Sequence, residues 1–281
     1  MRSYVASTRD SLTVMLSEAD VRQYHQDGLL IPRYRLTEDR LGEIREAYAK
    51  FVADNPQVHR DQVVNPHLRY SAAQGTHGDP RWLEVANHPP ILDMVEQLIG
   101  PDLLLWGMTF FGKPAGTGKT IPWHQDGDYW PIRPLANISV WIALDECTVE
   151  NGCLRYIPGS HKMNRVGRHI DTNHNEMLLE KALHPSEFEE SRARDLLLQA
   201  GQMAMFDVFL VHGSNANRSP QRRAALVLRI MPTTSHFDRE LGIEIGKTVR
   251  PPDMGTRPLF LLRGIDRCGL NDLRVGHEVA G

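Results

Sequence analysis

The spacing of apolar residues changes from a helical to a strand-like pattern near Leu103. Ahead of this point, a serine followed by acidic residues is typical of a helix N-terminus, so we expect a helix that begins at Ser17 and ends at Gly28. A Thr-Glu-Asp sequence at Thr37 predicts a second helix running towards Pro56. The N-terminal part, about residues 17–100, is therefore expected to be helical.

Between about Leu103 and Pro232 the apolar residues form short runs rich in Val, Ile, Phe and Trp, separated by clusters of Gly, Pro and Asn. Such runs are typical of strands joined by turns. The candidate strands are Leu103–Lys113, Ala136–Asp145, Cys153–Pro158, Met203–Val211 and Arg223–Met231.

The sequence Glu150-Asn151-Gly152 lies between two of these runs and predicts a β-hairpin, because Asn-Gly adopts the positive φ angles of a type I′ turn. That turn would bring Cys147 and Cys153 fairly near each other. The polar stretch of about residues 161–200 is expected to be partly helical and to loop out of the sheet. In the tail from Pro251, the apolar residues 258–262 are expected to pack back on the body.

The composition is that of a globular protein: 41% of the 281 residues are hydrophobic and 24% are charged. We expect one domain, residues 1–281, since β-barrels often reach this length as a single unit. A formal net charge of -3 gives no basic patch of the kind that nucleic acid or an anionic membrane requires. The expected partner is a small-molecule substrate, and the protein is expected to be a monomer or a homodimer.

The sequence predicts a cytoplasmic location. Charged residues interrupt every apolar stretch of the first 20 residues, so no signal-peptide core is present there, and no later apolar run has membrane-spanning length. The three cysteines, Cys147, Cys153 and Cys268, are too few for a disulfide framework and are expected to be reduced thiols.

A His-x-Asp motif supplies two of the three ligands of the 2-His-1-carboxylate triad that holds iron(II) in non-haem oxygenases. On an extended strand, residues two apart face the same side, so both can reach one ion. The motif alone decides nothing, because it occurs six times, at His25/Asp27, His59/Asp61, His77/Asp79, His124/Asp126, His169/Asp171 and His236/Asp238.

The sequence around each motif distinguishes His124/Asp126 from the other five pairs. His25 and Asp27 end a predicted helix, where residues two apart face nearly opposite sides. Only His124 and Asp126 stand between strong strand candidates, and the others lie in polar connections or beyond the last apolar run. His212 ends an apolar run and is the natural third ligand.

The sequence from His212 to Arg223 resembles the phytanoyl-CoA dioxygenase family, in which a histidine, a serine two positions later and an arginine eleven positions later form the distal metal ligand and the co-substrate clamp. Ser214 and Arg223 stand at that spacing. The resemblance also covers Lys113-Pro114, the motif Trp123-His124-Gln125-Asp126, Trp141, and the sequence from Asn151-Gly152 to Ile157-Pro158-Gly159-Ser160-His161, and more weakly about residues 17–239.

The resemblance implies a double-stranded β-helix, or jelly roll, with flanking helices: a helical part (about 17–100), a core (about 101–240) and a C-terminal extension (241–281). It also implies an iron(II) enzyme that uses 2-oxoglutarate and dioxygen, with ascorbate as an aid in vitro. A facial triad of His124, Asp126 and His212 keeps three positions open for a chelating 2-oxo acid and dioxygen. Because related halogenases have a small residue in place of the carboxylate, Asp126 argues for hydroxylation, although desaturation and ring closure share the triad.

Four residues are expected on the co-substrate side. Arg223 suits the distal carboxylate of 2-oxoglutarate because its guanidinium is planar, bidentate and permanently charged, and Ser214 adds a hydroxyl donor. By resemblance, Gln125 and Trp141 line the same side. The substrate side is expected to include Trp130, by the same resemblance, and Tyr129, Thr109 and Phe111. The substrate would be a small polar metabolite, such as an amino acid, a phosphonate or a natural-product intermediate.

Two other classes of protein compete with this interpretation. Gly116-Thr117-Gly118-Lys119-Thr120 resembles the end of a phosphate-binding loop, but Lys113 replaces the required first glycine and Pro122 interrupts the helix that should follow. A non-catalytic jelly roll that binds a metal or a small molecule is the second alternative, because a fold alone does not establish activity.

Overall fold

Two antiparallel sheets form a jelly roll in the computed structural model, which describes residues 14–172, 177–247 and 252–277. The seven-stranded sheet has the order β1 (Leu29–Leu30), β11 (Met203–Asp207), β6 (Ile138–Ala143), β13 (Arg223–Pro232), β3 (Leu103–Lys113) and β15 (Phe260–Arg263), with β2 (Gln62–Val64) also paired to β3. The four-stranded sheet has the order β10 (Arg194–Leu196), β7 (Leu154–Tyr156), β12 (His212–Ser214) and β4 (Ile121–His124). This confirms the fold class expected from the sequence.

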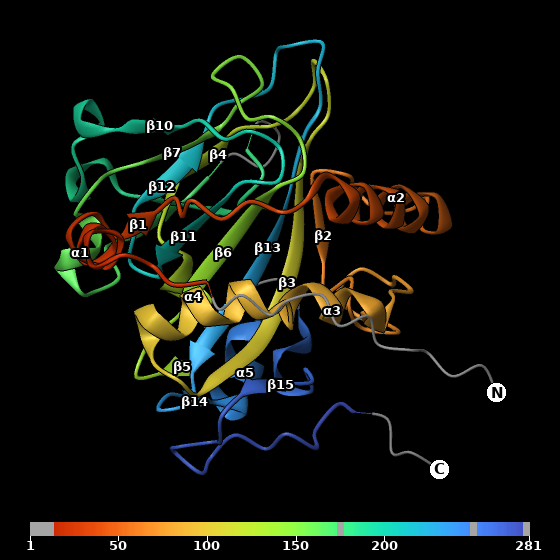
Figure 1. Ribbon diagram of the computed structural model, residues 1–281, viewed down its shortest axis with the longest axis vertical. Coiled ribbons are helices and arrows are strands. Elements are labelled where there is room, and N and C mark those ends of the chain that lie inside the picture. Colours follow the sequence, from red (N-terminus) through yellow and green to blue (C-terminus); the bar gives the residue numbers. More distant parts are fainter. Residues whose placement is uncertain (1–13, 173–176, 248–251, 278–281) are drawn as a thin grey trace.

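Helices cover the outer face of the seven-stranded sheet, and α4 crosses its strands in Figure 1. The α-helices are α1 (Glu18–Asp27), α2 (Glu38–Asp54), α3 (Leu83–Ala86), α4 (Pro89–Ile99) and α5 (Arg239–Gly246). Two short ribbons pair β5 (Ile132–Arg133) with β14 (His236–Phe237), and β8 (His169–Asp171) with β9 (Lys181–Leu183). None of the helices in the described part of the chain is long and apolar enough to cross a membrane.

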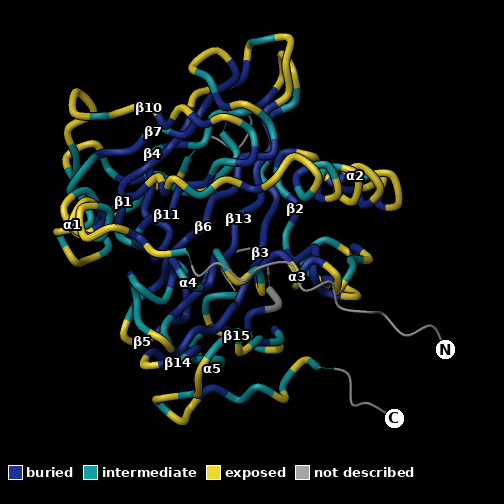
Figure 2. The backbone as a smooth tube through the Cα atoms, in the orientation of Figure 1, coloured by how far each residue is buried: buried dark blue, intermediate teal, exposed yellow. Residues whose placement is uncertain are grey.

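The alternation of side chains along β13 divides the core into two layers. Leu226 and Leu228 point outward and pack with the apolar residues of α2 and α4. Ala225 and Val227 point inward and pack with residues of the four-stranded sheet. Because both faces are covered, the central strands are buried along nearly their whole length, as Figure 2 shows. The inner layer leaves the space in which the candidate site lies.

The predicted helices and strands are largely found. Ser17 caps α1 through a capping box with Asp20, Gly28 ends the helix at φ 77°, and Thr37 caps α2. All five candidate strands contain a strand, although only residues 203–207 of the run 203–211 are extended in a ladder. The apolar tail residues form β15, which pairs with β3. The start of that tail, at Pro251, lies outside the described residues.

The expected hairpin at Asn151-Gly152 is wrong. The strands on either side, β6 and β7, belong to different sheets, so the turn is a connection between the sheets. Only Gly152 has a positive φ, of 75°, whereas a type I′ turn needs two such residues. Asn151 instead uses its side chain: its Oδ1 accepts from the Thr148 amide at 2.9 Å, and its Nδ2 donates to the Glu146 carbonyl at 2.8 Å.

The expectation for residues 161–200 is also wrong in part. Their described residues contain short 3-10 turns but no α-helix, and β10 of this stretch is an edge strand of the four-stranded sheet. Residues 178–181 and Asp171, around the β8–β9 ribbon, line the cavity in which the candidate site lies. The segment therefore covers the site rather than looping away from it.

The three cysteines are not joined by disulfides. Burial raises the pKa of Cys147 to about 12 and that of Cys153 to about 11, so both remain protonated thiols at neutral pH. Both belong to the inner core layer.

Phe110 tests the outer core layer. It is fully buried, with ring centroids 4.5 Å from Tyr48 and 4.9 Å from Trp82. Phe110→Ala should lower the free energy of unfolding by about 3–5 kcal/mol, because it removes buried apolar surface and leaves a cavity. Leu197→Ala is the control: Leu197 is 58% exposed, and its replacement should change stability by no more than about 0.5 kcal/mol. Urea unfolding of the two variants checks this, and equal losses would contradict the core assignment.

Candidate metal centre

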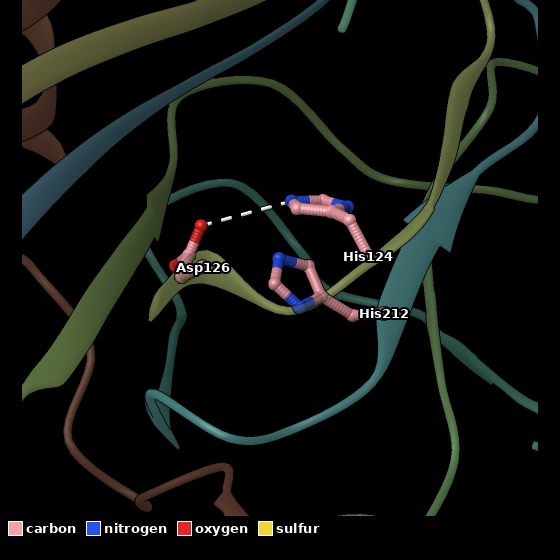
Figure 3. Close-up of side chains that lie close together, drawn as sticks. All are labelled: His124, Asp126 and His212. Carbon is pink, nitrogen blue, oxygen red and sulfur yellow. Dashed lines mark ion pairs between the residues drawn. The ribbon is translucent and has the colours of Figure 1, made fainter. Parts of the chain in front are cut away.

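Strand pairing brings two histidines face to face. In the ladder between β12 and β4, His212 lies directly opposite His124, and their ring centroids are 4.2 Å apart. Gln125 is extended, with φ -117° and ψ 135°, so Asp126 returns to the same side as His124 before a short 3-10 helix, Asp126–Tyr129, begins. The ligand atoms of these three residues lie within 4.8 Å of one another, and Figure 3 shows the side chains pointing together.

Backbone carbonyls fix the orientation of both imidazoles. His124 Nδ1 lies 2.9 Å from the Pro122 carbonyl oxygen, and His212 Nδ1 lies 3.0 Å from the Leu210 carbonyl oxygen. A carbonyl only accepts, so both Nδ1 atoms carry the proton and both Nε2 atoms present a lone pair. Ser139 Oγ also donates to Asp126 Oδ2, at 3.2 Å.

The charge states of Asp126 and His212 are those of metal ligands. Burial opposes ionisation of Asp126, but His124, His212 and Arg229 together outweigh it and hold the pKa of this carboxyl below its ordinary value. Burial, with a smaller contribution from His124, lowers the pKa of His212 to about 4. One carboxylate and two imidazoles on one side of a buried site suit a divalent transition metal such as iron(II).

A cavity of about 310 Å³ opens beside the triad, and Arg223 and Ser214 are among the residues that line it. Arg223 is 2% exposed; its Nη2 donates to the Gly152 carbonyl at 2.9 Å and its guanidinium lies 5.4 Å from the Trp141 ring centroid. Its Nε and the hydroxyl of Ser214, both buried, have no hydrogen-bond partner. A buried guanidinium beside a buried hydroxyl fits a carboxylate ligand, because such a ligand would satisfy both donors.

Arg223, the first residue of β13, and Arg222, directly before the strand, face opposite sides. Arg223 points into the cavity, whereas Arg222 points outward and pairs with Asp145, at 2.9 Å between Nε and Oδ2. Lys113 is opposite Arg223 on β3 and is fully buried. Burial, with repulsion from Arg223 second, lowers the pKa of Lys113 to about 6.

Most of the other expected site residues line the same cavity. They are Trp141 on the side of Arg223, and Trp130, Tyr129, Thr109 and Phe111. The expectation that Gln125 lines the co-substrate side is wrong, because Gln125 does not line the cavity. Its amide donates to the carbonyls of Arg165 and Phe209 and accepts from the Gly167 amide, so it anchors the segment behind the metal site.

Sequence reasoning missed seven polar or charged residues of the cavity, namely Arg229, Arg257, Asn65, Gln62, Asp171, Glu180 and Lys181. A signal for Arg229 was present, because it stands an even number of residues after Arg223 on one strand and so shares its face. Arg257, Asn65 and Gln62 come from distant segments, and no periodicity links them to the site.

In the described part of the chain, the other His-x-Asp pairs do not form a group with a third potential metal ligand. His59 pairs with Asp61 at 3.1 Å, and His169 lies 3.5 Å from Asp128. Among residues 14–172, 177–247 and 252–277, the one group of three potential metal ligands is His124, Asp126 and His212.

A jelly roll that holds two histidines and one aspartate around a single point defines a class, the mononuclear non-haem metal enzymes. The sequence profile of the family "Phytanoyl-CoA dioxygenase (PhyH)" matches residues 24–225, and the chain belongs to this family of iron(II)- and 2-oxoglutarate-dependent oxygenases.

Named relatives cover most of the chain. A probable phytanoyl-CoA dioxygenase of Caenorhabditis elegans is 27% identical over 233 residues, 75% of this chain and 74% of the relative. The L-proline trans-4-hydroxylase of Streptomyces griseoviridis is 29% identical over 273 residues, 88% of this chain and 95% of the relative. Among solved structures, the apo form of the non-heme monooxygenase ThoJ is 24% identical, with a TM-score of 0.66 over 89% of this chain and 85% of that chain.

The repeated sequence His-Gln-Asp-Gly offers a matched test of the metal site. Asp126→Ala should weaken Mn(II) binding by on the order of a hundredfold or more, since even outer partners of metal ligands contribute about 10–100-fold. Asp27→Ala, in the same four-letter sequence at the end of α1, should bind one Mn(II) ion as the wild type does. Calorimetric titration with Mn(II) measures both, and undiminished affinity in Asp126→Ala would refute the assignment.

Proposed function

We propose that the chain hydroxylates a C–H bond of a small polar metabolite, with 2-oxoglutarate converted to succinate and CO2. One observation carries the proposal: the His124, Asp126 and His212 cluster shares a cavity with Arg223 and Ser214, whose buried donors lack partners. A metal site beside an anion site is the arrangement that a metal-chelating dicarboxylate requires.

His124, Asp126 and His212 are proposed to hold iron(II) on one face. When bound, the iron and 2-oxoglutarate together supply the activation of dioxygen for attack on a C–H bond. The carbonyls of Pro122 and Leu210 hold the two imidazoles so that both Nε2 atoms would be available to the metal. Ser139 holds one oxygen of Asp126, which leaves Oδ1 on the side of His124.

Arg223 and Ser214 are proposed to bind the distal carboxylate of 2-oxoglutarate. The guanidinium of Arg223 is held from one side by the Gly152 carbonyl and from its face by Trp141. Fixing the guanidinium in this way before the ligand arrives lowers the conformational entropy that binding would otherwise cost. Tight orientation of the co-substrate is thus expected to come from a rigid strand, β13, rather than from a loop.

Trp130, Tyr129, Thr109 and Phe111 are proposed to contact the substrate. The cavity mixes these aromatic residues with polar groups, and its volume of about 310 Å³ suits a small molecule. Relatives named L-proline trans-4-hydroxylase and ectoine dioxygenase, the latter from Sphingopyxis alaskensis and 25% identical over 266 residues, act on small molecules by their names. Residues 178–181 cover the cavity and would help to exclude water.

The wider organisation follows the same proposal. We propose a single catalytic domain over residues 1–281, acting in the cytoplasm as a monomer or a homodimer. A human relative carries the name "Phytanoyl-CoA dioxygenase, peroxisomal", so the compartment of this chain needs its own test, by localisation of the tagged full-length protein.

Succinate release tests the proposed reaction. Purified protein with iron(II), ascorbate and 2-oxoglutarate should release succinate faster when a fraction of a metabolite extract contains the substrate, and the product should gain one oxygen atom. Binding of 2-oxoglutarate without any oxygen-dependent succinate would favour a non-catalytic binding protein.

The adjacent arginines test the co-substrate site. Losing one side of a buried, hydrogen-bonded charge pair costs about 2–5 kcal/mol, so Arg223→Ala should raise the apparent requirement for 2-oxoglutarate by tens-fold or more. Arg222→Ala should stay within a few-fold of the wild type, because its exposed ion pair with Asp145 contributes up to about 1 kcal/mol. Titration of 2-oxoglutarate against both variants, with iron saturating, measures the difference. A large defect in Arg222→Ala alone would contradict the register of β13.

A further inference from the structure

Arg229 is a second cavity arginine on β13, and the proposed reaction leaves it without a role. It lies on the same inward face as Arg223, Ala225 and Val227, towards the opposite end of the strand. On the neighbouring β6 it is paired with Ser139, the residue that donates to Asp126. Because Ser139 donates to Asp126 Oδ2, this register places Arg229 on the strand next to a neighbour of the metal cluster.

The guanidinium of Arg229 is fixed but has no anionic partner. Its Nη1 donates to Thr109 Oγ1 at 2.8 Å, and its central carbon lies 5.1 Å from the Trp130 ring centroid and 5.8 Å from that of Trp106. Its Nε is buried and has no hydrogen-bond partner. Within the described residues no carboxylate forms an ion pair with Arg229. Aromatic rings beside the guanidinium leave its N–H edges as the groups available to a ligand.

A β-bulge makes room in front of Arg229. Arg229 pairs with Gly107 and Ile230 with Leu105, so Trp106 is an extra residue of β3 at this point. A Cβ atom at Gly107 would lie 3.8 Å from Arg257 Nη1, 3.9 Å from Arg229 Cδ and 3.9 Å from Asn65 Oδ1. Two guanidinium side chains and an amide therefore converge over a residue that has no side chain.

The charges of this part of the cavity call for an anion. Asp126 and Arg223 together with a divalent metal and the 2-oxoglutarate dianion would be electrically balanced. Of the other charged residues that line the cavity, Asp171, Glu180 and Lys181 lie at the β8–β9 ribbon, whereas Arg229 and Arg257 lie beside Gly107. Burial acts most strongly against the charged form of Arg229 and lowers its pKa; Asp126 favours the charged form, and repulsion from Arg257 acts against it. Since arginine stays protonated, an anionic group is the way to offset this repulsion.

We propose that Arg229, with Arg257, binds an anionic oxygen group of the substrate, a carboxylate or a phosphonate. This proposal rests on the proposed function, because it assigns Arg223 to 2-oxoglutarate and the opposite end of the cavity to the substrate. The anion anchors one end of the substrate next to Asp126, and the aromatic residues Trp130 and Phe111 contact the part that reacts. Neutral metabolites and metabolites with cationic groups alone are not substrates.

Small anions test the site directly. The full-length protein is loaded with Mn(II) and saturated with 2-oxoglutarate, so that Arg223 is occupied, and is titrated with acetate, methylphosphonate and the neutral acetamide. Trp106 and Trp130, beside Arg229, report binding through their fluorescence. Acetate or methylphosphonate should bind at least about tenfold more tightly than acetamide, and the better of the two identifies the anion.

Three variants separate the possible outcomes. Arg229→Met should weaken binding of the better anion by at least about tenfold while calorimetry shows unchanged 2-oxoglutarate binding, and Arg229→Lys should give an intermediate loss. Arg222→Met, on the outer face, should behave as the wild type.

Equal binding of acetate and acetamide, or full anion binding by a folded Arg229→Met protein, would overturn the proposal. If Arg229→Met does not fold, Arg229→Lys and the anion-to-amide ratio of the wild type decide. Failure of the wild type to bind 2-oxoglutarate in the first calorimetric step would instead refute the proposed function.

Discussion

The antiparallel pairing of β12 with β4 is the constraint on which the site depends. It sets His212 opposite His124, and backbone carbonyls then turn both Nε2 atoms to one point. A shift of one residue in this register would turn one imidazole to the other face of the sheet and leave Asp126 with a single histidine. The metal site is therefore a property of strand register rather than of any short motif.

A second consequence of strand geometry is the separation of charge along β13. Arg223 and Arg229 share one face, with Ala225 and Val227 between them, and lie towards opposite ends of the strand. The inward side chains between them, Ala225 and Val227, are apolar, so the cavity has two separate positive groups along this strand. A dianion and a second anion could occupy such a cavity at the same time, because each would have its own guanidinium.

The sequence was sufficient for the fold and for the closeness of His124, Asp126 and His212, because apolar runs, helix caps and ordered family motifs are local signals. The His-x-Asp motif occurs six times, so its presence alone could not identify the metal ligands. The position of His124 and Asp126 between two predicted strands identified them. The structure places His124, Asp126 and His212 together, and Arg223 inside with Arg222 outside, as expected.

The expectations from the sequence are wrong where the tertiary structure overrides a local pattern. Asn151-Gly152 looks like a hairpin, but the strands beside it belong to different sheets, which no local pattern reveals. Gln125 stands between two cluster residues in the sequence, yet strand alternation turns it away from them. The polar residues 161–200 give no clear strand signal because much of that segment lies on the surface, over the cavity.

A crystal structure of the full-length protein with Mn(II) and 2-oxoglutarate tests the central claim most directly. The account predicts one metal ion bound by Nε2 of His124, Nε2 of His212 and a carboxylate oxygen of Asp126, with the distal carboxylate of 2-oxoglutarate on Arg223 and Ser214. A metal ion held by another His-x-Asp pair, or 2-oxoglutarate anchored on Arg229 instead of Arg223, would contradict it.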